Sequence, residues 1–106
     1  MELAHETLHV HHSALGVARW AAGQAIPAYR KHLRDQLVRA ADSVVLNIAE
    51  GAGQDPGESR RHHYRIAAAS AAEVAAVLDL IALPGGALRQ AELWIIVGSL
   101  CELVRR

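Results

Sequence analysis

The sequence predicts an all-α fold, an antiparallel four-helix bundle that occupies residues 1–106 as a single domain. Alanine, the strongest helix former, fills 21 of the 106 positions, whereas aromatic residues make up 4%. Three short segments rich in glycine or proline divide the chain into four stretches. Apolar residues recur in each stretch at helical spacing. Because connections this short join antiparallel neighbours, the helices should run up, down, up and down.

The four predicted helices cover approximately residues 2–25, 28–50, 56–83 and 87–105. The first ends near Ile26-Pro27, because proline disfavours helical backbone at the residue before it. The core stripes expected of the first three helices are Ala4, Leu8, His11, Leu15, Ala18 and Ala22, then Leu33, Leu37, Ala40, Val44 and Ile48, then His63, Ile66, Ser70, Val74, Val77 and Ile81.

The connection between the second and third helices carries the clearest boundary signals. Gly51 suits the left-handed position just past a helix end. Asp55 is placed to cap the next helix, with Pro56 at its first position and Glu58 three residues after the cap. These residues predict a capping box at the start of the third helix.

The fourth helix is apolar around nearly its whole circumference between Leu93 and Val104. A helix of this kind needs cover on every side, which a four-helix monomer does not give. We therefore expect a homo-oligomer, the alternative being a small core with exposed apolar surface. The expected interface residues are Leu93, Trp94, Ile96, Val97, Leu100 and Val104, joined by second apolar faces on the first helix (Val10, Ala14, Val17 and Ala21) and the second helix (Val38, Ala41 and Val45).

Charge and cysteine content exclude several classes of protein. Eleven basic and eleven acidic residues give zero net charge, which excludes an overall basic protein that coats nucleic acid. The lone Cys101 cannot form an internal disulfide and is expected to be a buried, inert thiol. The N-terminus lacks a signal-peptide pattern, and the apolar run from Leu93 to Cys101 is too short to span a membrane. We expect a cytoplasmic protein with no membrane association, no cofactor and no small-molecule substrate.

Histidines gather at one end of the predicted bundle, which receives six of the seven: His5, His9, His11, His12, His62 and His63. Of these, His5, His9 and His12 share one helix face and are candidate metal ligands. A ring could bring one such stripe from each subunit into a metal-binding or pH-responsive collar. A ferritin-like di-iron site is disfavoured because the Glu-x-x-His motif occurs on one helix alone. The alternative is a solvated helix surface.

Arginines also lie at this end, and they are candidate contacts for nucleic acid or another anion: Arg60, Arg61, Arg65, Arg105 and Arg106. No aromatic residues are interleaved with them to stack on bases. The alternative is a charged face that keeps the protein in solution.

Polar residues follow one flank of the second helix, at Ser43, Asn47 and Glu50. Glu50 should meet Arg60, Arg61 or His63, and Asn47 should reach the third helix. An acid/base pair of Glu50 and Glu73 is disfavoured, because antiparallel helices place these residues at different heights. We interpret the group as polar contacts that set helix register.

The run from Gln36 to Gly53, QLVRAADSVVLNIAEGAG, resembles the signature of the bacterial four-helix bundle family of 23S rRNA-intervening-sequence proteins. Ile66-Ala67, Ser70, Glu73 and Leu78 fit the third helix of that family, and Ile26-Pro27 lies at its first turn. The residues of this chain that carry the motif are Ser43, Asn47, Glu50, Gly51, Ser70 and Glu73.

The resemblance implies a left-handed bundle that assembles into a closed ring, usually a homopentamer, and it implies no enzyme activity. A related protein is the accessory protein of diversity-generating retroelements, which binds nucleic acid together with a reverse transcriptase. Gln54 and Ala68 stand where the family often carries basic residues, and His63 where it often carries phenylalanine.

Taken together, the sequence predicts a non-catalytic oligomeric bundle that acts as an interaction or scaffolding module. One alternative is an accessory factor for RNA or a ribonucleoprotein, with a reverse transcriptase or ribosomal RNA as its partner. A second is an oligomer whose histidines bind metal or respond to pH.

Overall fold

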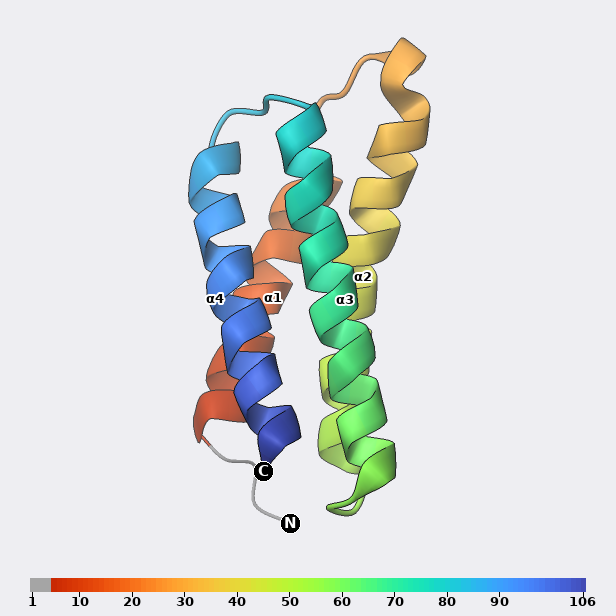
Figure 1. The fold of residues 1–106 in the computed structure, drawn as a ribbon. Helices are drawn as coiled ribbons and strands as arrows, with labels where there is room; N and C mark the ends of the chain where they lie inside the picture. Colours follow the sequence, from red (N-terminus) through yellow and green to blue (C-terminus); the bar gives the residue numbers. More distant parts are fainter. Residues whose placement is uncertain (1–4) are drawn as a thin grey trace.

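The computed structural model describes residues 5–106, and in this range it contains helices and no strands. Its elements are α1 (His5–Ala22), a short 3-10 helix η1 (Ala28–Arg30), α2 (Lys31–Gly53), α3 (Glu58–Leu80) and α4 (Gly86–Arg105). The four α-helices lie side by side (Figure 1), in a body of 44 × 21 × 19 Å. The all-α fold class is therefore confirmed. The expected helix start at residue 2, and Ala4, lie outside the described residues.

The connections of the bundle lie at its two ends (Figure 1). The α1–α2 and α3–α4 connections lie at one end, and the α2–α3 connection lies at the other end with the C-terminus. The most extensive contacts join α2 to α3 and α3 to α4, while α1 packs on α2 and α4. The pair of α2 and α3, each 23 residues long, therefore forms the main body against which the other helices pack.

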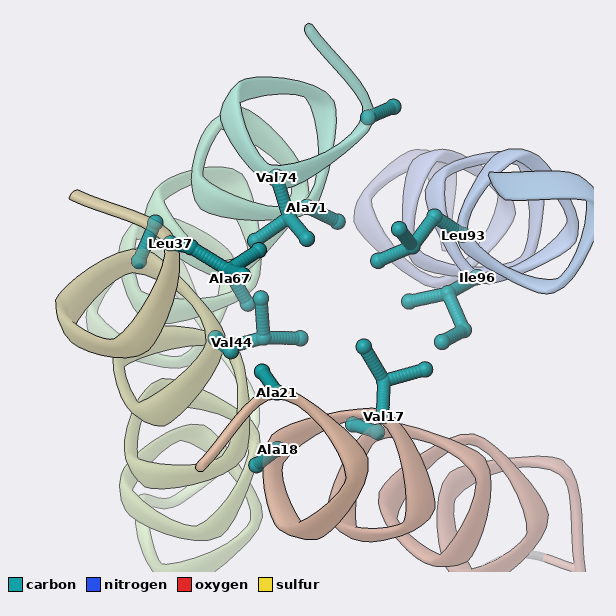
Figure 2. Close-up of a cluster of buried hydrophobic side chains, with 14 of the residues drawn as sticks. Val17, Ala18, Ala21, Leu37, Val44, Ala67, Ala71, Val74, Leu93 and Ile96 are labelled. Carbon is teal, nitrogen blue, oxygen red and sulfur yellow. The ribbon is translucent and has the colours of Figure 1, made fainter. Parts of the chain in front are cut away.

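The core lies along the axis of the bundle, where all four helices direct apolar side chains toward one another (Figure 2). Leu37 and Val44 of α2 point into this cluster from one side and Leu93 and Ile96 of α4 from another, and all four are at most 2% exposed. The stripe predicted for α2 is buried along its whole length: Leu33, Leu37, Ala40, Val44 and Ile48.

The stripe predicted for α1 was largely wrong, since Ala18 is the one member among its described residues that is buried. Leu8 is 50% exposed, and Ala22 is exposed as well. The buried face is the one that had been expected to contact another subunit: Val10, Ala14, Val17 and Ala21, each at most 3% exposed. Both faces of α1 are apolar, so periodicity alone does not choose between them. The small residues of the buried face fit closely against α2, as Ala18 and Ala21 do beside Val44 in Figure 2.

The buried face of α3 is rotated from the predicted one. Val74, Val77 and Ile81 are buried as expected, whereas His63 and Ser70 are only partly buried. Alanines and one tyrosine complete the face instead: Tyr64, Ala67, Ala71 and Ala75. The rotation leaves His63 and Ser70 at the edge of the α2–α3 contact, where polar side chains can find partners.

The capping box predicted at the start of α3 does not form. The residue before the helix is Gly57, whose φ of 146° suits glycine, and no side chain caps the helix end. Glu58 accepts hydrogen bonds from Arg61 and Arg65 in place of the backbone. Because α3 begins at Glu58, this residue is the first of the helix and does not lie three residues after a cap, where a capping box needs it.

Gly51 does not occupy the left-handed position expected past the end of α2, because α2 continues to Gly53. A Cβ atom at Gly51 would lie 2.6 Å from Cε1 of Tyr64, a ring that is 3% exposed. Glycine at this position therefore allows α3 to approach α2 closely, and its conformational freedom is not used.

We expect Gly51→Ala to lower the free energy of unfolding by about 1–3 kcal/mol, the usual cost of overpacking. Gly53→Ala is the matched control, because nothing lies within 4 Å of the position of its Cβ. That change should be neutral or stabilising by up to about 1 kcal/mol, through better helix propensity. Denaturant unfolding of both variants measures the difference, and equal effects would contradict the close contact with Tyr64.

Candidate functional site

The outward face of α4 is an apolar surface without charge. Leu88 and Ile95 are each 67% exposed and Trp94 is 53% exposed. Every exposed residue of α4 between positions 87 and 101 is uncharged, and the set is Ala87, Leu88, Ala91, Trp94, Ile95, Gly98 and Cys101. We refer to these seven residues as the α4 face.

The inward side of α4 belongs to the core of the same subunit. Leu93, Ile96 and Leu100 had been expected to contact another subunit, but they are at most 1% exposed within this chain. Val97 and Val104 are partly buried and pack against the core. Trp94 is the one expected interface residue that is exposed. The sequence therefore misidentified the outward side of α4, because most of the residues expected at a subunit interface point into the core.

Cys101 is exposed, contrary to the expectation of a buried thiol. The residues that the sequence interpretation missed are Leu88, Ala91, Ile95 and Gly98. Their spacing of three, four and three residues is the signal that identifies them as one stripe. Arg89 and Glu92 border this stripe and pair with each other at 3.1 Å.

A groove between the start of α1 and the end of α2 is a second apolar feature of the surface. Its volume is about 460 Å³. The lining is mostly apolar and consists of Thr7, Leu8, His11, Ile48, Ala49, Ala52 and Gly53. Leu8, which is half exposed, and Ala49, which is exposed, make its rim accessible. We refer to this feature as the α1/α2 groove.

A ladder of polar side chains joins α2 to α3. The hydroxyls of Ser43 and Ser70 lie 2.8 Å apart. The amide nitrogen of Asn47 donates to the Ser43 carbonyl and hydroxyl at 3.0 and 3.1 Å, and Asn47 Oδ1 lies 3.1 Å from Nδ1 of His63. His63 Nε2 in turn lies 3.6 Å from a carboxylate oxygen of Glu50. The structure thus pairs Glu50 with His63, one of the three partners expected for it.

Glu50 and Glu73, the two acidic residues of the motif, do not act together. Glu50 faces His63, whereas Glu73 lies 3.9 Å from Arg39. Each carboxylate therefore joins α2 to α3 through a different cationic or ionisable partner. This arrangement suits a contact that sets helix register and does not form an acid/base pair.

The arginines proposed as anion contacts are engaged within the chain. Arg61 and Arg65 both bind Glu58. Arg105 binds Glu102, and Arg106 binds Glu6. Arg60 donates to the carbonyls of Gly51 and Gln54 at the end of α2, where a cation stabilises the helix terminus. An anion would have to compete with these contacts for the guanidinium groups.

The candidate metal ligands His5, His9 and His12 are exposed along α1. In the part of the chain that the structure describes, no group of three or more His, Cys, Asp or Glu residues is arranged to hold a metal ion. The three histidines are therefore not brought together into a site within one subunit. Within residues 5–106, no helix is both long and apolar enough to cross a membrane.

The engagement of the arginines can be tested by titration. The pKa of Glu58 lies below its ordinary value of 4.5, because Arg65 hydrogen-bonds to the carboxylate and its charge, with a further hydrogen bond from Arg61, adds to the effect. A carboxyl whose pKa is lowered by folding adds stability above its unfolded pKa and loses it as the pH falls. In Arg65→Gln, the pKa of Glu58 should rise toward 4.5, as followed by NMR.

Arg105→Gln is the matched control for this titration. The pKa of Glu102 is also lowered, first by its hydrogen bond from Arg105. That variant should therefore raise the pKa of Glu102 and leave the pKa of Glu58 unchanged. A wild-type Glu58 that titrates at 4.5 would show that its arginines are free to bind other anions.

The comparison with known families gives one finding for this chain. The family model described as 23S rRNA-intervening sequence protein matches residues 10–92. This range contains the polar ladder and the close contact of Gly51 with Tyr64. Neither the curated proteins nor the solved structures gave a match. Since the matched range runs from within α1 into the first part of α4 and covers most of the chain, the chain belongs to the 23S rRNA-intervening sequence protein family.

Proposed function

We propose that this protein is a non-catalytic homo-oligomer that acts in the cytoplasm as an interaction or scaffolding module. Its subunit would be a left-handed, antiparallel up-down-up-down bundle, and its assembly a closed ring, with a pentamer favoured by the family resemblance. The alternating position of the connections in Figure 1 supports the antiparallel course. The single observation that carries the proposal is the uncharged, exposed α4 face.

The spacing of the α4 face favours a helix as its partner. Leu88, Ala91, Ile95 and Gly98 follow the alternation of three and four residues found in coiled-coil seams. The face extends over about 20 Å at the helical rise of 1.5 Å per residue. Ala91 and Gly98 leave room between Leu88, Trp94 and Ile95 for the ridges of an approaching helix. A surface of this kind marks an interaction site more often than it marks bare solvent exposure.

A second copy of this chain is the occupant that the structure favours, because the chain also carries a complementary surface. In a closed ring, each subunit uses two different surfaces, one to contact each of its two neighbours. The α4 face projects large apolar side chains, and the α1/α2 groove is an apolar recess of about 460 Å³. We propose that the α4 face of one subunit packs at the α1/α2 groove of the next.

The pairing of polar side chains supports a non-catalytic role. Glu50 and Glu73, the carboxylates nearest the polar ladder, face His63 and Arg39 of the same bundle. These two carboxylates do not face each other. The ladder therefore joins two helices and does not bring together the acid/base pair that catalysis would need.

An accessory role with RNA is the competing proposal, and the name of the family favours it. It predicts binding to structured RNA that weakens steeply as salt rises, because phosphate contacts release counterions. A salt-sensitive mobility shift would replace the scaffold proposal with this one. The metal-binding or pH-responsive collar of His5, His9 and His12 stays a prediction, tested by zinc-dependent stabilisation of the folded protein.

We expect Ile95→Lys to convert the assembly to monomers, because a buried, unpaired charge opposes association. The wild type should sediment at a multiple of 11.4 kDa at micromolar concentration. Leu80→Lys is the matched control, since Leu80 is a similarly exposed leucine, 63% exposed, at the end of α3. It should leave the assembly intact, and all three proteins should keep their helical circular dichroism. A wild type that sediments at 11.4 kDa would contradict the proposal.

Mixing two variants tests the pairing of the α4 face with the α1/α2 groove. Ile95→Lys damages the face and Ala49→Lys damages the groove, so each variant alone should be monomeric. An equimolar mixture retains one intact face and one intact groove, and it should form a dimer of about twice 11.4 kDa. If the α4 face instead pairs with itself, Ala49→Lys alone should assemble and the mixture should gain nothing.

A further inference from the structure

His63 is the one histidine that lies in the polar ladder between α2 and α3. Its side chain is 21% exposed, and its two ring nitrogens face different groups of α2. Nδ1 lies 3.1 Å from Oδ1 of Asn47, and Nε2 lies 3.6 Å from a carboxylate oxygen of Glu50. The hydrogen bonds of the ladder determine which of these nitrogens carries a proton.

The orientation of the Asn47 amide follows from its partners. A backbone carbonyl can only accept a hydrogen bond, so the group of Asn47 that lies 3.0 Å from the Ser43 carbonyl must be the NH₂. The amide oxygen of Asn47 is then directed at His63. Because this oxygen can only accept, His63 Nδ1 must carry a hydrogen and donate it.

This assignment determines whether His63 Nε2, the ring nitrogen that faces Glu50, carries a hydrogen. In neutral histidine one ring nitrogen carries the hydrogen, and here it is Nδ1. Nε2 of the neutral ring therefore presents a lone pair to the carboxylate of Glu50, an unfavourable contact between two acceptors. When the ring gains a proton, Nε2–H faces the carboxylate, and both nitrogens donate to groups of α2.

We propose that His63 is a proton-operated clamp between α2 and α3, which closes on Glu50 when the ring is protonated. The clamp lies at the end of the bundle where α2 and α3 are connected. In its closed form the imidazolium bridges Asn47 and Glu50 of α2, one helical turn apart. In its open form the bond to Asn47 remains and the contact with Glu50 is lost.

The charged and titratable surroundings of His63 are few. The His63 ring contacts Glu50 of α2 and, on α3 itself, the His62 ring, which lies 5.8 Å away in an edge contact, and Arg60 lies one helical turn before His63 on α3. Among the described residues of α1 and α4, no side chain forms a hydrogen bond or ion pair with His63. Glu50 is 64% exposed, so protons reach the pair from solvent.

The clamp predicts a direction for the effect of pH. An imidazole exchanges its proton around pH 6.5, whereas a glutamate carboxyl does so near pH 4.3. The interval from pH 8 to pH 5.5 spans the ordinary value for an imidazole and lies above that for a carboxyl. The clamp predicts that the contact between α2 and α3 strengthens as the pH falls across this interval and weakens as it rises.

Glu50→Gln tests the clamp, with Glu73→Gln as its matched control. Both substitutions remove a carboxylate from the α2–α3 contact, but the partner of Glu73 is Arg39, which stays charged at both pH values. From pH 8 to pH 5.5, the unfolding constant of Glu50→Gln relative to wild type should rise about threefold, as expected of one partly exposed ion pair. The ratio for Glu73→Gln should stay constant. Denaturant unfolding at equal protein concentration gives both ratios.

NMR of the wild-type protein tests the hydrogen-bond assignment independently. Nitrogen-15 shifts of His63 at pH 8 should show a protonated Nδ1 and a bare Nε2, and at pH 5.5 they should show both nitrogens protonated. A proton on Nε2 at pH 8 would overturn the assignment. A ratio for Glu50→Gln that stays constant with pH would overturn the clamp even if the assignment holds.

Discussion

The contact between α2 and α3 is the most extensive in the bundle, and small side chains are prominent among the buried residues of both helices. Ala67, Ala71 and Ala75 of α3 are fully buried, and Ala40 and Ala41 of α2 are at most 3% exposed. At the connected end, Gly51 leaves space for the ring of Tyr64. Close packing of this kind gains dispersion energy along the whole contact. It also leaves no room for polar groups, which are found at the edge of the contact instead.

The edge of that contact explains the family motif in physical terms. Ser43, Asn47 and Ser70 satisfy one another in a ladder, and His63 and Glu50 complete it. No buried side-chain nitrogen or oxygen among the described residues lacks a hydrogen-bond partner. Hydrogen bonds require particular distances, whereas apolar contacts tolerate sliding. The ladder therefore specifies one register between two helices whose alanine faces would otherwise fit in several.

The outward surface divides into charged and uncharged parts with different roles. The arginines at the histidine-rich end are bound by carboxylates and carbonyls of the same chain. Their positive charges are therefore balanced by nearby groups as well as in the net charge of the chain. The α4 face, by contrast, is left uncovered by the described residues of the same chain. The apolar residues that α4 directs outward are as large as those it directs inward. The assembly proposed above would give both sides of α4 a partner.

The sequence by itself determined the helical class, the stripe of α2 and the polar contact of Asn47 with α3, because period, alanine content and polar spacing are properties of one helix at a time. It did not determine which of two apolar faces α1 buries, nor which side of α4 points outward. Val10 and Leu8 are equally apolar, as are Leu93 and Ile95, yet one of each pair is buried and the other exposed. That choice depends on the shape of the neighbouring helices, which only the tertiary structure supplies. The capping box failed for a local reason: α3 begins at Glu58, so Glu58 does not lie three residues after a cap, and its carboxylate accepts from Arg61 and Arg65 of its own helix.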